Sequence, residues 1–267
     1  MSSRPNVTLS ISVALIYLFL LAPLIIVVLF SFSEKSFFTF PPEGFSLRWY
    51  KSAWELGIFG GPAIRSIILA VSATFLATVL AIPSALALRR LQGSLLARVL
   101  EFVLLTPLIV PALIIGIALL YFLIRVDMID TFPALLGAHT LLVFPFMFRA
   151  ILVNALDIKK HLEEASEILG AGPWRTFFSV VMPSLVPGIT SGAIFAFIVS
   201  FDQFTVSLFV TQSDQITLPV ALYKYVYDVN DPVAAAVSST LVILGLVVAF
   251  GLQKLGLLEH IGGRGTA

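Results

Sequence analysis

Long uncharged, apolar stretches are the feature of this sequence that most constrains its fold. They occupy residues 11–31, 66–88, 102–124, 131–148, 176–201 and 233–253. A helix rises 1.5 Å per residue, so about 20 apolar residues are needed to cross about 30 Å of hydrocarbon. The alternation over about ten residues that is typical of membrane β-barrel strands is missing. The pattern therefore predicts an all-α, polytopic membrane protein.

The stretches predict six transmembrane helices in a single domain, residues 1–267. Their approximate spans are 11–31, 64–88, 100–124, 131–152, 188–210 and 233–253. Pro183 and Pro187 favour a fifth helix that begins near Gly188, because proline interrupts the hydrogen bonding of a helix interior. For the same reason we expect kinks at Pro107, Pro111 and Pro145.

The composition excludes several classes of protein. The chain is 59% hydrophobic and 12% charged, whereas a soluble domain is about 45–50% apolar and about 25% charged. Sixteen basic and fifteen acidic residues give a net charge of +1, which does not favour nucleic-acid binding. Cysteine is absent, so disulfides and thiolate metal sites are excluded. An ordinary soluble enzyme is excluded as well.

The basic residues predict the orientation of the chain. With both termini in the cytoplasm, ten of the sixteen Lys and Arg residues lie on the inner side, most of them in segments 89–98 and 149–175. Cytoplasmic loops carry the excess of Lys and Arg in membrane proteins. Outside, aromatic residues in segment 32–63 predict a short helix at the membrane interface.

The largest inner segment, residues 155–187, has the pattern of two short helices. An amphipathic helix is predicted over 157–169, with one apolar stripe made by Ile158, Leu162, Ala165, Ile168 and Leu169. Gly170 and Gly172 are suited to end this helix in a left-handed turn.

Pro173 is suited to begin the next helix, because proline fits the first helical position. That second helix is predicted over 174–181 and is expected to stop at Pro183. Two short helices joined by a glycine turn, with an apolar stripe, indicate a segment that docks into another protein.

This segment resembles the EAA loop of ABC importer permeases. The loop's pattern is Glu-Ala-Ala, three residues, Gly, nine residues, then Ile-x-Leu-Pro. Glu164, Ala165, Gly170 and Pro183 stand at the matching positions, and Ser166 replaces the second Ala. Val180 and Met182 replace Ile and Leu. The resemblance implies a coupling loop to an ATPase that includes Glu163, Glu164, Ala165, Ser166, Gly170, Ala171 and Pro183.

The resemblance also implies a type I ABC importer permease fold and a set of partners. The loop would insert a coupling helix into a separate ATP-binding cassette subunit, of which two are expected. ATP and Mg would bind to those subunits, and this chain would bind no cofactor and would not be an enzyme. Indeed, the sequence lacks the Gly-x-x-x-x-Gly-Lys-Ser/Thr phosphate-binding motif. We also expect a second, homologous permease subunit that forms a heterodimer with this chain, and an extracytoplasmic solute-binding protein. The expected location is the bacterial inner membrane.

Other segments resemble the spermidine/putrescine branch of these permeases, and within it the second permease subunit. They are residues 41–50, 106–111, 200–202 and 217–219. The resemblance implies import of a small polar solute, a polyamine or a related amine or amino-acid derivative. Related branches carry phosphonates, iron, thiamine or opine-type conjugates, and these remain alternatives.

Asp202 is the candidate substrate-path residue, because it falls within the predicted fifth helix. To place a carboxylate at the centre of a membrane helix costs roughly 2.5–3.5 kcal/mol on the scale from membrane-insertion experiments. In the first interpretation Asp202 therefore lines the translocation path and attracts a cationic amine. In the second interpretation the helix ends early, and Asp202 is a solvated cap or pairs with a neighbouring subunit. Phe201 and Phe204 beside it are candidates for a gate.

Two functions of other classes remain open on the residues alone. An ion-coupled secondary carrier would need several ionisable residues within the membrane, and Asp202 is the one we find. An intramembrane enzyme would need a catalytic or metal-binding cluster, but His139, His161 and His260 are scattered. We expect His139 to be hydrogen-bonded between helices rather than to bind a metal ion.

Overall fold

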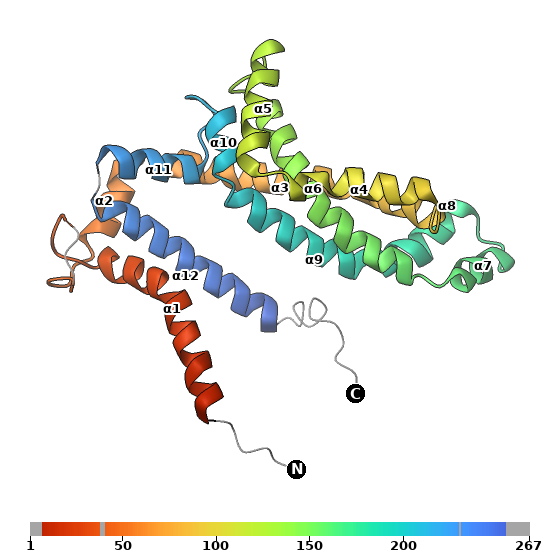
Figure 1. The fold of residues 1–267 in the computed structure, drawn as a ribbon, viewed down its shortest axis with the longest axis horizontal. Helices are drawn as coiled ribbons and strands as arrows, with labels where there is room; N and C mark the ends of the chain where they lie inside the picture. The colour runs from red at the N-terminus through yellow and green to blue at the C-terminus, as the bar shows by residue number, and fades with distance from the viewer. Residues whose placement is uncertain (1–6, 38–40, 230, 255–267) are drawn as a thin grey trace. The chain divides into compact units, whose positions relative to one another are not determined.

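Every regular element is helical in residues 7–37, 41–229 and 231–254, the part of the chain that the computed structural model describes (Figure 1). The elements are α1 (Val7–Ser31), α2 (Arg48–Leu56), α3 (Gly60–Arg90), α4 (Leu95–Ile109), α5 (Ala112–Arg125), α6 (Phe132–Asp157), α7 (Lys160–Ile168), α8 (Pro173–Thr176), the π-helical turn η1 (Phe177–Val181), α9 (Met182–Phe201), α10 (Thr205–Val210), α11 (Leu218–Asp228) and α12 (Val233–Lys254). The predicted all-α class is confirmed for the described residues.

Four helical runs are each long and apolar enough to cross a membrane. They are Leu9–Ser31 in α1, the whole of α3, the whole of α6, and the run Pro173–Phe201 that joins α8, η1 and α9. The pair α4 and α5 also passes this test when taken together, which gives a fifth candidate. The apolar stretch of α12, Val233–Val247, is shorter. The described residues thus contain four or five candidate spans, and the sixth stays a prediction.

The kink expected at Pro111 within the predicted span 100–124 is confirmed and is a full break between two helices. Helix α4 ends at Ile109, α5 begins at Ala112, and the two are bent by 97°. Pro111 lies between them, and Val110 before it is extended, with φ −78° and ψ 128°. Proline disfavours the helical conformation in the residue that precedes it, which accounts for a break at this point.

The predicted bounds of the fifth helix, 188–210, are wrong. Helical structure is continuous from Pro173 to Phe201 and stops before Asp202. Pro183 does not end a helix but lies in the first turn of α9, where proline is tolerated. The π-helical turn η1 directly precedes it, so the usual α-helical hydrogen-bond register has already been changed there.

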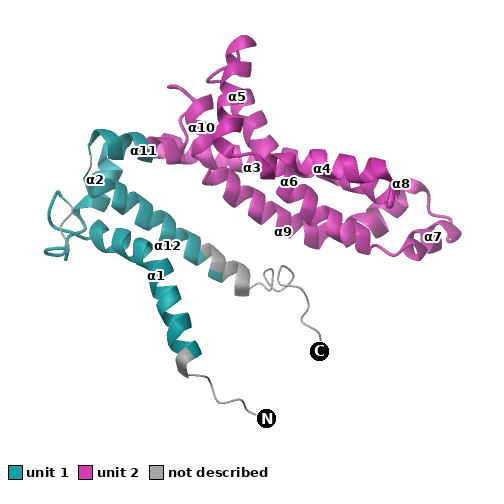
Figure 2. Cartoon of the chain, viewed as in Figure 1, with its two compact units in different colours: residues 1–59, 222–251 teal, residues 60–221, 252–267 magenta. Residues whose placement is uncertain are grey.

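The chain divides into two compact units, which Figure 2 distinguishes by colour. The first comprises residues 1–59 and 222–251. Within it, the Tyr50 hydroxyl of α2 lies 2.7 Å from Ser31 Oγ at the end of α1 and 2.8 Å from Ser239 Oγ of α12. The short helix predicted in segment 32–63 is α2. Its place at a membrane interface stays a prediction. The single domain over residues 1–267 also stays a prediction.

The second unit, residues 60–221 and 252–267, contains the packed core. Helix α3 contributes a stripe of fully buried alanines to it: Ala70, Ala73, Ala77, Ala81 and Ala85. Small residues allow helices to approach closely, which suits packing in a membrane. Larger buried side chains of α6 and α9, including Phe148, Ile151 and Leu185, fill the remaining space. This core supports the candidate site, whose residues come from α3, α6, α7 and α9.

Candidate functional site

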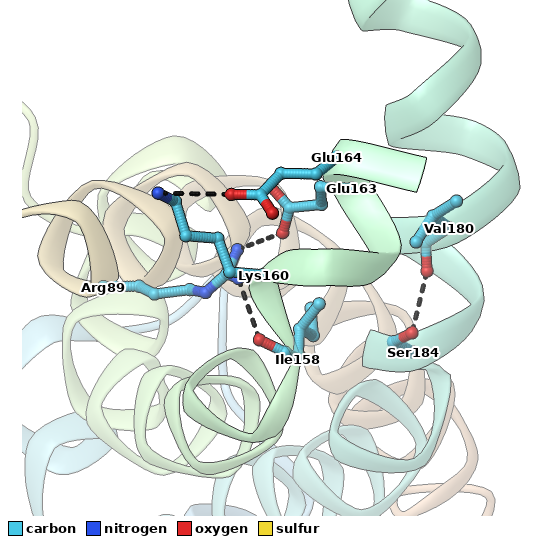
Figure 3. Close-up of polar contacts among 7 residues, drawn as sticks. All are labelled: Arg89, Ile158, Lys160, Glu163, Glu164, Val180 and Ser184. Atoms are coloured by element: carbon cyan, nitrogen blue, oxygen red, sulfur yellow. Dashed lines mark hydrogen bonds and ion pairs between the residues drawn. The ribbon is translucent and has the colours of Figure 1, made fainter. Parts of the chain in front are cut away.

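Arg89 connects the end of α3 to the segment that follows α6 (Figure 3). Its Nη1 donates to Glu163 Oε1 at 2.5 Å, and its Nη2 donates to the carbonyl oxygen of Ile158 at 2.9 Å. The Arg89 and Glu163 side chains are only 17% and 27% exposed. Charge-assisted hydrogen bonds are stronger than neutral ones, so Arg89 fixes both the start and the first turn of α7.

Helix α7 ends in a turn that requires glycine. Gly170 has φ +82°, the left-handed conformation that costs other residues roughly 1–2 kcal/mol. The amide of Ala171 donates to Ser166 O at 3.1 Å, and the amide of Gly170 donates to Glu167 O at 2.9 Å. This is the double hydrogen bond of a Schellman motif. The predicted left-handed turn at Gly170 is therefore confirmed, and so is the helix start at Pro173, the first residue of α8.

The turn places large apolar side chains at the surface. Ile168 and Leu169 are each 86% exposed, and Trp174, just beyond the turn, is 75% exposed. The predicted stripe is divided as a result, since Ile158 is buried and the other members face outward. Helix α7 begins later than predicted, at Lys160 rather than at residue 157, because Ile158 and Lys159 are extended between α6 and α7.

The remaining predicted loop residues have local, mostly exposed contacts. Glu164 pairs with Lys160 one turn earlier at 3.4 Å, a contact that Figure 3 also shows. Ser166 Oγ lies 3.0 Å from the buried Thr176 Oγ1, which links α7 to α8. Ala165 is exposed, and Pro183 is exposed in the first turn of α9. The structure thus brings Glu163 to Arg89 and leaves Glu164 and Ala165 open to a partner.

The second candidate region is the interruption that follows α9. Asp202 caps the end of α9 and is exposed, and its carboxylate has no hydrogen bond or ion pair with any residue that the structure describes. Phe201 stacks on Phe197 with ring centroids 6.0 Å apart, and Phe204, partly buried, precedes α10. The helix ends early, as the second sequence interpretation of Asp202 expects, and the role of its carboxylate in the path stays a prediction.

His139 forms the interhelical hydrogen bonds that the sequence led us to expect. Its Nδ1 lies 2.9 Å from Ser200 Oγ, and its Nε2 lies 2.9 Å from Ser207 Oγ. Among the described residues there is no group of three His, Asp or Glu side chains that could hold a metal ion. Arg89, by contrast, was missed by sequence reasoning, because a basic residue at the end of a helix gives no sign of a partner 74 positions away.

Residues 77–255 match the family described as "Binding-protein-dependent transport system inner membrane component". The chain belongs to this family. It is therefore an inner-membrane permease component of an ABC importer, and it is a non-catalytic transporter subunit. The secondary carrier and the intramembrane enzyme are thereby set aside.

Curated relatives of this permease cover most of its length. The putrescine transport system permease protein PotI of Escherichia coli is 27% identical over 238 residues, which are 86% of this chain and 84% of PotI. The spermidine/putrescine transport system permease protein PotC of Escherichia coli is 27% identical and covers 89% of each chain. The molybdenum transport system permease protein ModB of Mycobacterium tuberculosis is 32% identical over 71% of this chain and 76% of ModB.

A solved structure shows the same fold. It is the crystal structure of a bacterial ABC transporter involved in the import of the acidic polysaccharide alginate, with a TM-score of 0.77 and 18% identity. The match covers 95% of this chain and 98% of the other. The permease fold predicted from the sequence resemblance is thus supported over nearly the whole chain.

Proposed function

We propose that this permease forms half of the translocation path of an ATP-driven importer and that segment 155–187 couples it to a separate ATPase. In this proposal the chain crosses the membrane six times with both termini in the cytoplasm. Two ATP-binding cassette subunits bind ATP and Mg, and a second, homologous permease subunit supplies the other half of the path. An extracytoplasmic binding protein delivers the solute.

The observation that carries the coupling role is the exposed apolar surface at the end of α7. Ile168, Leu169 and Trp174 stand out from a turn that the Gly170 hydrogen bonds hold in one conformation. Burial of a large apolar side chain is worth about 1.5–3 kcal/mol, so a rigid group of three favours a protein partner. Ile168 and Leu169 lie between the long apolar runs Phe132–Asp157 and Pro173–Phe201, and Trp174 lies at the start of the second run.

A rigid connection to the transmembrane helices is the second requirement for coupling. Arg89 supplies one through Glu163 and the Ile158 carbonyl, and the Ser166–Thr176 contact supplies another toward α8 and α9. A movement imposed on α7 by an ATPase would therefore be passed to α3 and to the run that contains α9. The coupling residues proposed from the family pattern are Glu163, Glu164, Ala165, Ser166, Gly170, Ala171 and Pro183.

For the substrate, we infer a small cationic solute, a polyamine or a related amine. The relatives PotI and PotC are named for putrescine and spermidine transport, and the carboxylate of Asp202, which is exposed and has no partner among the described residues, is suited to attract an ammonium group. Phe201 and Phe204 flank that carboxylate as candidate gate residues. The ModB relative, at 32% identity, makes molybdenum uptake the second candidate.

Uptake by the reconstituted importer tests this function. Proteoliposomes that contain the permease with its ATPase, partner permease and binding protein are supplied with labelled putrescine, spermidine or molybdate, with and without internal ATP. We expect ATP-dependent uptake of a polyamine and a decrease of at least tenfold for Asp202→Asn. Asp127→Asn is the matched control, because Asp127 is also exposed and lies outside α9 and α10. Uptake without ATP would contradict the coupling role, and unchanged uptake by Asp202→Asn would remove Asp202 from the path.

A further inference from the structure

His139 of α6 contacts both sides of the interruption that separates α9 from α10. Ser200 lies in the last turn of α9, and Ser207 lies in the first turn of α10. Both hydroxyls are 2.9 Å from a ring nitrogen of His139. All three side chains are buried, with at most 3% exposure. One imidazole ring therefore bridges residues that lie on opposite sides of Asp202, Gln203 and Phe204.

The hydrogen bonds around the ring have a definite direction. Ser207 Oγ lies 2.7 Å from the carbonyl oxygen of Gln203 and donates its single proton to it. Ser207 Oγ must then accept a proton from His139 Nε2–H, because a hydroxyl has one donor and further acceptor capacity. In this tautomer Nδ1 is an acceptor, so Ser200 Oγ donates to it. The chain runs from Ser200 through His139 and Ser207 to the backbone of Gln203, within the interruption itself.

The helix α10 is also held at its other end. The amide of Asp130 donates to the carbonyl oxygen of Val210 at 3.1 Å, and α10 packs on α5, where Phe209 contacts the position of Gly116. Both ends of α10 are thus fixed to the part of the chain around α5 and α6. The hydrogen bonds from His139 to Ser200 and Ser207 therefore fix the conformation of the residues between α9 and α10.

We propose that His139 is a positioning residue that fixes the interruption at residues 202–204 and so sets where Asp202 and Phe204 stand. Among the described residues the ring is the hydrogen-bond partner of the Ser200 hydroxyl and the donor to the Ser207 hydroxyl, which also bonds to Gln203 O, and an unsatisfied buried polar group is costly. Replacement of the ring by an apolar group would leave the Ser200 hydroxyl without its partner, break the connection between Ser200 and Ser207, and loosen the interruption. The effect of such a replacement on transport rests on the proposed function, in which Asp202 lines the path. Its effect on the order of residues 202–204 does not depend on that function.

A nitroxide label tests the proposal on the assembled importer in lipid nanodiscs. The chain has no cysteine, so Gln203→Cys gives a single labelling site on it in the interruption. His139→Phe keeps an aromatic ring but removes both hydrogen bonds. In this variant we expect the ratio of mobile to immobile label to rise about tenfold, because a loss of about 1.4 kcal/mol changes an equilibrium by that factor. His139→Gln retains an amide donor and is expected to restore most of the immobile signal.

Controls make each result decisive. Thr140→Val is the matched variant, because Thr140 is the next residue of α6, is buried, and bonds only to Leu136 O of its own helix among the contacts of the described residues. It should leave the label immobile. Ser200→Ala removes the hydroxyl that bonds to His139 Nδ1 and serves if His139→Phe does not assemble. A mobile label in His139→Phe or Ser200→Ala supports the proposal, even if uptake by Asp202→Asn is normal. An unchanged label in both variants would overturn it.

Discussion

Arg89 at the end of α3 and Glu163 in α7 form an ion pair across 74 positions of sequence, and the same guanidinium donates to the Ile158 carbonyl. The pair connects a transmembrane helix to the segment that carries the exposed apolar surface of Ile168, Leu169 and Trp174. The Arg89–Glu163 pair is not part of the EAA pattern, because Glu164, and not Glu163, occupies the position of the glutamate in that pattern. The sequence predicts for this loop a contact with a partner. The structure shows in addition that the loop is linked to α3.

Loss of this ion pair should weaken both stability and coupling. Arg89→Ala removes hydrogen bonds to a carboxylate and a carbonyl, and hydrogen bonds to charged groups are worth about 1.5–3 kcal/mol. We expect a lower midpoint of thermal unfolding in nanodiscs and less uptake per ATP hydrolysed. Arg90→Ala is the control, since Arg90 is adjacent and exposed. The double exchange of Arg89→Glu with Glu163→Arg should regain part of the loss, because it restores the charges but not the bond to Ile158. Equal behaviour of Arg89→Ala and Arg90→Ala would argue against the link.

The turn at Gly170 should be sensitive to a methyl group for conformational reasons alone. A Cβ atom on Gly170 would meet nothing within 4 Å, but φ is +82°. Gly170→Ala should therefore cost about 1–2 kcal/mol and reduce the affinity of the ATPase for the permease, while Gly170→Asn is better tolerated. Gly172→Ala is a close control, because Gly172 also has open space and its φ is −71°. The affinity is measured by titration of labelled ATPase, and equal effects of the two alanines would contradict the role of the turn.

The packing of α9 on α6 predicts a steric effect at Gly188. A Cβ atom there would lie 2.6 Å from the carbonyl oxygen of Ala150 and 2.6 Å from Asn154 Nδ2. Because a backbone atom cannot move aside easily, Gly188→Ala should destabilise the permease by about 1–3 kcal/mol. Gly137→Ala in α6 should be neutral or stabilising by up to about 1 kcal/mol, since nothing lies within 4 Å of that position. Thermal unfolding of both variants measures the difference.

Asp130 predicts an acid-sensitive contact in the turn between α5 and α6. Burial would raise the pKa of this carboxyl, but backbone amides of Asp214, Gln212, Ser213 and Gln215 donate to it and lower its pKa to about 2. The depressed pKa means that the charged form stabilises the folded state above pH 4, and that this contribution is lost as the pH falls toward 2.

The measurement for Asp130 is the cleavage of the 211–217 segment by an acid-active protease between pH 5 and pH 2. The native permease should become cleavable as the pH falls, whereas Asp130→Asn should be cleavable throughout. Asparagine tolerates the left-handed backbone of residue 130, where φ is +58°. A flat pH response of the native permease would exclude this contribution of Asp130.

The sequence predicts the helical runs but not the size of the break at Pro111 or the bounds of the fifth helix. Hydropathy gives the helices α1, α3, α6 and α12 within a few residues of their ends. The prolines indicate a kink at Pro111 but not its size, and the helix start is placed at Gly188, although Pro183 lies within a helix. Proline has opposite outcomes at these two places because the preceding backbone differs: an extended residue before Pro111 and a π-helical turn before Pro183.

For the candidate site, local chemistry could be predicted and distant contacts could not. The turn at Gly170 and the start at Pro173 follow from backbone preferences of these residues. The partner of Glu163 depends on where the end of α3 lies in space, which no periodicity encodes. Likewise, a lone histidine predicts a hydrogen bond, but the choice of Ser200 and Ser207 depends on the interruption after Phe201. The sequence offers an early helix end at Asp202 only as one of two interpretations.

A site-specific cross-link from the end of α7 tests the central claim most directly. Leu169→Cys is labelled with a thiol-reactive photo-crosslinker in the cysteine-free chain and illuminated in the assembled importer. Trp54→Cys in α2 serves as the control, because its side chain is 88% exposed. The account predicts a covalent product with the ATPase from Leu169→Cys, changed in yield by ATP, and none from Trp54→Cys. Labelling of lipid or solvent alone from Leu169→Cys would contradict it.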